Sequence, residues 1–200
     1  MPLPVPDGPA RRVPISRYTL AVSWTPEFCR NGRDANSIQC SGRNGRFGFV
    51  LHGLWPESAS GPHPQWCAVR PRPSPQLIRR NLCMTPVPAM LEHEWAKHGS
   101  CMARTPEAYF GAAAALWAPL RWPDADRLSR KAGLTVGDLR REVALANPRW
   151  PAEGIGIVVS RNGWLRELRL CYSRRLQPIA CARPQLGPAD ATPLKIWRGL

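Results

Sequence analysis

The spacing of apolar side chains predicts strands in the first quarter of the chain. Residues 18–24 (YTLAVSW) combine aromatic and branched side chains and are bounded by Pro26, a pattern that is typical of a strand. Residues 47–52 (FGFVLH) form an almost uninterrupted apolar run, which favours a buried strand. The polar segment between them contains Cys29 and Cys40. We therefore expect two strands joined by a long polar loop.

A second pair of strands is predicted near the other end of the chain. Residues 154–160 (GIGIVVS) and 164–173 (WLRELRLCYS) are rich in branched side chains, and Asn162-Gly163 lies between them. An Asn-Gly pair between two strand patterns is a strong signal for a tight hairpin turn. A last short strand is expected at residues 176–181.

The middle of the chain favours helices. Residues 88–97 start with a proline and lead to Gly99, which indicates a helix that ends at this glycine. Residues 105–119 contain the alanine-rich run PEAYFGAAAALW and form a second candidate. Residues 135–147 form a third, with Thr135 as its N-cap.

Strands at both ends and helices in the middle define an α+β class. We expect a single domain with a central antiparallel β-sheet packed with several α-helices, because 200 residues can bury one sizeable core. Residues 1–17 form a Pro/Arg-rich N-terminal tail, and residues 18–200 form the domain. The tail lacks the apolar stretch of a secretory signal, and no apolar run approaches the roughly 20 residues that span a bilayer.

The net charge of +14 favours a polyanionic partner, which could be nucleic acid, anionic lipid or acidic glycan. Arginine supplies 25 of the 28 basic residues, a skew that a GC-rich genome would also produce. The charge alone therefore names no partner.

Cysteine usage indicates an oxidising compartment, because seven cysteines are many for a chain of this length. They are Cys29, Cys40, Cys67, Cys83, Cys101, Cys171 and Cys181. The absence of any CxxC pair weakens a zinc-ribbon or thioredoxin-like interpretation. An odd count leaves at least one thiol without an internal partner, and any of the seven could instead be a buried free thiol. Residues 56–75 form a long proline-rich loop, which Cys67 could tether.

The first candidate motif is FVLHGLWP at residues 49–56, where a histidine ends the predicted buried strand. Gly53 allows the chain to turn and a ligand to approach the backbone. Trp55 offers a flat face on which a base could stack. Taken alone, His52 and Trp55 would more simply be a core histidine beside a core tryptophan.

The second candidate motif is HEWAKHGSC, which begins at His93. At 100° per residue of an α-helix, Glu94, Lys97 and His98 lie about 100°, 40° and 140° from His93. Four ionisable side chains therefore share one face, while Trp95 points away from it and can enter the core. Such a set is an unusual way to build a merely solvated surface, although that alternative stays open.

A zinc site is the other alternative for this helix. The zinc-protease pattern H-E-x-x-H places its histidines four residues apart. Here His93 and His98 are five residues apart, so the second histidine comes one position too late.

Together the two motifs resemble the active-site segments FxxHGLWP and HEWxKHGxC of the ribonuclease T2 family, in the same order. Residues 18–29 are similar to that family's opening strand and cysteine-bearing loop, and residues 106–110 (PEAYF) to the helix after the second segment. Residues 164–173 with Cys181 are similar to its C-terminal strand pair. The resemblance spans roughly residues 18–183 and implies a disulfide-stabilised, ribonuclease T2-like α+β fold.

The resemblance implies catalytic roles for four residues. His52 and His98 would be the acid–base pair, with His98 as the base and His52 as the acid. Glu94 and Lys97 match the polar residues that assist phosphate chemistry in the family.

It also implies three substrate-binding residues. His93 matches a phosphate-binding position, and Trp55 an aromatic of the base-binding region. Glu57 occupies the place of an acidic residue that commonly follows the first motif, which implies a role in base recognition.

The same resemblance implies how the cysteines pair. The expected disulfides are Cys29–Cys40, Cys67–Cys101 and Cys171–Cys181. The second of these would tie the long loop to the end of the catalytic helix, and Cys83 would be left over.

The implied function is an endoribonuclease that cleaves single-stranded RNA through a 2′,3′-cyclic phosphate. It would need no metal or cofactor and would have low or modest base specificity. We expect RNA as the partner, DNA at most bound and not cleaved, no membrane association and a monomer. The resemblance implies a secreted or periplasmic protein, whose export signal is not present in this chain.

An RNA-binding protein that keeps the fold and the basic surface without turnover is the competing hypothesis. The intact set of His52, Glu94, Lys97 and His98 argues against it.

Overall fold

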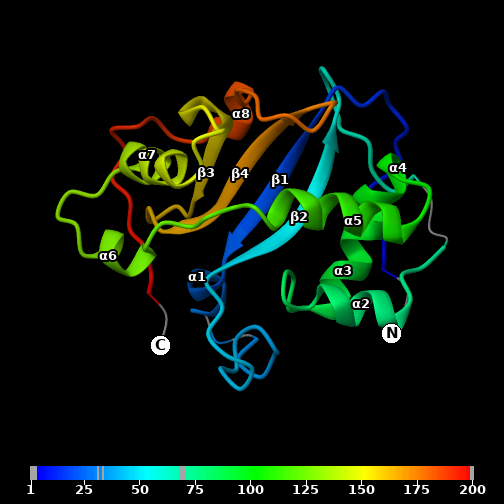
Figure 1. Cartoon of the computed structure of the whole chain (residues 1–200), viewed down its shortest axis with the longest axis horizontal. Helices are drawn as coiled ribbons and strands as arrows, with labels where there is room; N and C mark the ends of the chain where they lie inside the picture. Colours follow the sequence, from blue (N-terminus) through cyan, green and yellow to red (C-terminus); the bar gives the residue numbers. More distant parts are fainter. Residues whose placement is uncertain (1–3, 31, 33, 68–70, 199–200) are drawn as a thin grey trace.

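Four antiparallel strands form a sheet through the centre of the computed structural model, which describes residues 4–30, 32, 34–67 and 71–198 (Figure 1). They are β1 (Arg17–Trp24), β2 (Phe49–Glu57), β3 (Ile155–Val159) and β4 (Leu165–Ser173), in the order β2-β1-β4-β3. Because β1 pairs with both β2 and β4, the two ends of the sequence share one sheet. Leu20 of β1 is fully buried opposite Leu54 and Leu170.

Helices pack beside the two outer strands of the sheet (Figure 1). Those of the central segment, among them α3 and α5, lie along β2, and α7 contacts β3. The helical elements are α1 (Thr25–Cys29), α2 (Pro75–Asn81), α3 (Pro88–Glu94), the π-helical turn η1 (Trp95–Gly99), α4 (Ser100–Met102), α5 (Pro106–Trp117), α6 (Ala125–Ser129), α7 (Val136–Ala146), the 3₁₀ turn η2 (Ala152–Gly154) and α8 (Arg183–Leu186). The predicted single-domain α+β class with an antiparallel sheet is confirmed. Within the described part of the chain, no helix has the length and apolar character needed to cross a bilayer.

Two predicted elements are longer than the sequence indicated. The strand expected to end at His52 continues to Glu57, because its pairing with β1 extends to Arg17. The helix expected to end at Gly99 continues to Met102 through a π-helical turn. Gly99 keeps a helical φ of −59°. A Cβ there would stand 2.6 Å from the ring of Trp95, so the glycine permits close packing and does not end the helix.

The predicted strand at residues 176–181 is wrong. Only an isolated bridge between Tyr172 and Pro178 forms there. Pro178 has no backbone N–H to extend the ladder. The predicted hairpin between β3 and β4 is confirmed.

The described residues of the N-terminal tail pack against the loop that follows β2. Arg11 exchanges backbone hydrogen bonds with Gln65, and the Arg12 guanidinium donates to the carbonyl of Cys67. The tail therefore lies close to Cys67, whose disulfide joins this loop to Cys101 at the end of the second motif.

Three disulfides join the pairs that the family resemblance implied, Cys29–Cys40, Cys67–Cys101 and Cys171–Cys181. The Cys67–Cys101 bond ties the loop after β2 to α4. Cys83 is free and exposed.

Alkylation of the unreduced protein should label one cysteine, Cys83, because the other six are bonded. Peptide mass spectrometry after alkylation checks this. Reduction before alkylation is the control and should label all seven. An unlabelled Cys83 found in an intramolecular disulfide would contradict the pairing.

Candidate active site

The first motif lies on β2 and the second on the helix formed by α3 and η1, which packs against β2. Tyr109 of α5 supports this junction, because its hydroxyl accepts a hydrogen bond from the backbone N–H of Leu54 at 3.1 Å. His52 and His98 approach the same tryptophan, with ring centroids 5.0 and 5.5 Å from that of Trp55. The fold thus brings together two segments about 40 residues apart in sequence.

Glu94 is the most deeply buried charged group of the site, with 2% of its surface exposed. Trp55 donates its indole N–H to Glu94 Oε2 at 2.8 Å, and Glu94 Oε1 lies 3.6 Å from His52 Nε2. Burial raises the pKa of Glu94 to about 7, although the charge of His52 and the Trp55 hydrogen bond oppose the shift. The carboxyl can therefore hold or release a proton near neutral pH.

His52 is hydrogen-bonded through Nδ1 to Oε2 of Glu167 on β4, at 2.9 Å. Burial by itself lowers the pKa of His52, but the hydrogen bond to Glu167 and the charges of Glu94 and Glu167 outweigh it. The net result is a raised pKa, which favours the charged imidazolium.

His98 has the opposite character. Burial lowers its pKa to about 3, and the positive charge of Lys97 acts in the same direction. Its Nδ1 is buried and has no hydrogen-bond partner among the described residues. The His98 ring is therefore neutral, while the His52 ring tends to be charged.

Lys97 and His93 lie where the N-terminal tail crosses the site. The Lys97 ammonium is 2.5 Å from Oδ2 of Asp7, whose Oδ1 accepts a hydrogen bond from the indole N–H of Trp66. The ring of Trp66 also packs edge-on against His93, with ring centroids 5.3 Å apart. Burial and the charge of Lys97 lower the pKa of His93. The Lys97 ammonium is thus paired with the carboxylate of Asp7 from the same chain.

A cavity of about 840 Å³ opens beside His52, Trp55 and Glu167. It continues between α1, residues 85–90 and the β3–β4 edge of the sheet. The cavity is large enough to receive a nucleotide-sized group, since ligand pockets commonly measure roughly 300–1,000 Å³.

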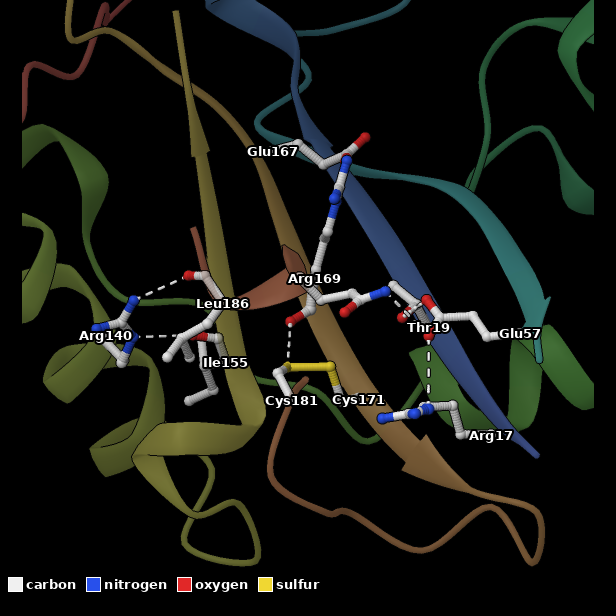
Figure 2. Close-up of a disulfide and its surroundings, with 11 residues drawn as sticks. Arg17, Thr19, Glu57, Arg140, Ile155, Glu167, Arg169, Cys171, Cys181 and Leu186 are labelled. Carbon is white, nitrogen blue, oxygen red and sulfur yellow. Dashed lines mark hydrogen bonds and ion pairs between the residues drawn. A yellow bond between two sulfur atoms is a disulfide. The ribbon is translucent and has the colours of Figure 1, made fainter. Parts of the chain in front are cut away.

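Glu57 lies away from this cavity. It is 4% exposed, and its two carboxylate oxygens accept hydrogen bonds from the Thr19 hydroxyl at 2.6 Å and the Gln185 amide at 3.2 Å. Figure 2 shows it near the Cys171–Cys181 disulfide, apart from Glu167. These contacts link β2 to β1 and to α8 (Arg183–Leu186), and they do not support the base-recognition role that the position of Glu57 after the motif suggested.

Sequence reasoning missed two acidic residues that contact the motif side chains, Glu167 and Asp7. Glu167 is 115 residues away from His52, and its position in a strand pattern carried no chemical signal. Asp7 lies in the predicted N-terminal tail, whose sequence carries no signal for a contact with Lys97. Within the described ranges, no three or more His, Cys, Asp or Glu side chains are grouped to hold a metal ion.

Comparison with known proteins identifies the family. Residues 15–135 match the model of the ribonuclease T2 family. A probable ribonuclease of Haemophilus influenzae is 32% identical over 187 residues, covering 87% of this chain and 64% of that protein. Ribonuclease I of Escherichia coli is 30% identical over 184 residues, covering 72% of this chain and 68% of that protein. The chain belongs to the ribonuclease T2 family, although it spans just under two thirds of the Haemophilus relative.

Solved structures agree on the fold. Trichomaglin, described as an S-like ribonuclease, superposes with a TM-score of 0.71 at 17% identity, covering 92% of this chain and 98% of that chain. RNase NT in complex with 5′-AMP superposes with a TM-score of 0.67 at 21% identity, with the same coverage.

Substituting Gly53 by alanine should destabilise the protein by roughly 1–3 kcal/mol, a typical cost of overpacking. The reason is that a Cβ at Gly53 would stand 1.9 Å from Glu94 Oε2 and 2.9 Å from the Trp55 indole nitrogen. Urea unfolding measures the loss.

Gly111→Ala is the matched control, because a Cβ there meets nothing within 4 Å and alanine favours the α5 helix. Its stability should be unchanged or higher. If Gly53→Ala were as stable as Gly111→Ala, the close approach of Glu94 to β2 would be wrong.

Proposed function

We propose that this chain is an endoribonuclease that cleaves single-stranded RNA by metal-independent transphosphorylation. The 2′-hydroxyl attacks the neighbouring phosphorus, the bond to the 5′-oxygen breaks, and the products are a 2′,3′-cyclic phosphate and a free 5′-hydroxyl. The observation that carries the proposal is the opposite protonation tendency of His52 and His98, whose rings both lie next to Trp55.

The reaction needs one neutral base and one charged acid. A neutral His98 accepts the proton of the attacking 2′-hydroxyl, and a charged His52 donates a proton to the departing 5′-oxygen. General acid–base help of this kind contributes roughly 10²- to 10⁴-fold. The lowered pKa of His98 and the raised pKa of His52 support this assignment over its reverse.

Negative charge accumulates on the phosphate as the fifth oxygen bonds to phosphorus. The Lys97 ammonium would stabilise that charge, and His93 would contact the phosphate from the same helix. Glu94, held by the Trp55 indole, would face His52 Nε2 and share its proton. Trp55 is partly exposed to the cavity and would contact a base.

Substrate class follows from the same chemistry. DNA has no 2′-hydroxyl, so it would bind at most and stay uncut. We propose low or modest base specificity, because the cavity beside His52 is wide for a single base. Three disulfides support a secreted or periplasmic location, where such bonds persist.

His52→Phe and His98→Phe should each reduce cleavage of RNA by orders of magnitude, and the double variant should lose little more, because the two residues act as a unit. Gel assays of total RNA in excess EDTA measure this. A wild-type protein that binds RNA but leaves it intact would identify a binding protein. Loss of cleavage in EDTA with recovery on adding one metal would refute the two-histidine mechanism.

A substrate whose leaving group needs no proton separates the two histidines. The acid variant His52→Phe should recover much of its rate on that substrate, whereas the base variant His98→Phe should not. Recovery by His98→Phe alone would reverse the assignment.

Asp7→Asn should strengthen anion binding by a few-fold, because it removes the carboxylate that pairs with Lys97, and exposed ion pairs are individually weak. Inhibition by inorganic phosphate at fixed ionic strength measures the change. Asp126→Asn is the control, because it removes one carboxylate from another surface ion pair. Asp126 of α6 pairs with Arg130, the residue that follows this helix. Equal phosphate inhibition in both variants would show that Asp7 does not compete for the Lys97 ammonium.

A further inference from the structure

Glu167 belongs to neither motif, yet it makes the shortest polar contact of His52. Its Oε2 lies 2.9 Å from His52 Nδ1, and its Oε1 accepts a hydrogen bond from Arg169 Nε at 3.1 Å. Glu167 is 8% exposed. A carboxylate this buried, with one oxygen on the imidazole and the other on a guanidinium, has a defined orientation.

The sheet explains how the two side chains meet, since β1 separates their strands. Ser23 of β1 pairs with Glu167, and Ala21 pairs with Arg169, so small side chains lie on that face between the longer ones. On β2 the register shifts, with Leu51 opposite Val22 and Gly53 opposite Ala21. His52 is the extra residue of this bulge. Bulges re-aim side chains, and this one turns His52 across β1 towards Glu167.

We propose that Glu167 is a positioning residue for His52: it accepts a hydrogen bond from the Nδ1–H, leaves the transferable proton on Nε2 beside Glu94, and stabilises the charged ring that serves as the acid. This proposal rests on the proposed RNA cleavage. Glu167 itself touches no reacting atom in this arrangement. Its effect on the reaction passes through the orientation and charge of the imidazole.

The charges that face His52 make this role testable. Glu167 and Arg169 approach from β4 and Glu94 from α3, and His98 lies next to Trp55. The two carboxylates raise the pKa of His52, whereas Arg169 lowers it. Neutralising Glu167 and neutralising Arg169 should therefore shift the titration of His52 in opposite directions.

The experiment is an NMR titration of the imidazoles, which number four in this chain, in wild type, Glu167→Gln and Arg169→Met. His52 should titrate at lower pH in Glu167→Gln and at higher pH in Arg169→Met. The acid must be protonated, so activity falls as pH rises through the pKa of His52. The alkaline limb of the kcat/KM profile should therefore move to lower pH in Glu167→Gln and to higher pH in Arg169→Met.

At the pH optimum of the wild type, kcat of Glu167→Gln should fall by about 10- to 100-fold with little change in KM, a part of the roughly 10²- to 10⁴-fold that a general acid contributes. Glu142→Gln is the control, because Glu142 pairs with Arg127 on the surface. It should leave both the titration and the kinetics unchanged.

The outcomes are distinguishable. An unchanged His52 titration in Glu167→Gln, or shifts of the same sign in both variants, would overturn the positioning role. If Glu167→Gln fails to fold, the direction of the Arg169→Met shift decides. A wild-type protein that leaves RNA intact would instead refute the proposed function, while the titration still reports on the Glu167–His52 contact.

Discussion

Burial of the Glu94 carboxyl between its own helix and β2 is the constraint on which the rest of the site depends. The carboxyl fits only because residue 53 is glycine, and the Trp55 indole supplies its hydrogen bond. Burial raises the pKa of Glu94 and the charge of His52 partly opposes this, while Glu94 adds to the effect of Glu167 in raising the pKa of His52. A buried charge is costly unless it is compensated. The helix that carries Glu94, strand β2 and the Trp55 indole must therefore keep their relative positions.

Opposite environments then distinguish two chemically identical side chains. His52 faces two carboxylates, whereas His98 lies near the Lys97 charge and its Nδ1 is buried with no partner among the described residues. Two groups whose pKa values are driven apart are what an acid–base pair requires. The difference arises from neighbours on β4 and on the helix.

The N-terminal tail adds a second level of organisation. Its Asp7 reaches the Lys97 ammonium and the Trp66 indole, beside His93. An anionic substrate entering this place would meet a carboxylate that already neutralises the lysine. In the proposed function, phosphate binding would therefore depend on how firmly the tail lies along residues 63–67, where Arg11 and Gln65 pair.

The sequence by itself determined the four strands of the sheet, the long helices, the family and the motif residues, because periodicity and motif spacing are local properties. It did not reveal the π-helical turn at Trp95–Gly99 or the bulge at His52, and the bulge depends on the register of β2 against β1. Only the tertiary structure brought Glu167 to His52, because β4 and β2 lie on the two sides of β1 and these side chains meet across it. The same holds for Glu57, whose place after the motif suggested a ligand contact, whereas in the structure it accepts hydrogen bonds from Thr19 of β1 and Gln185 of α8.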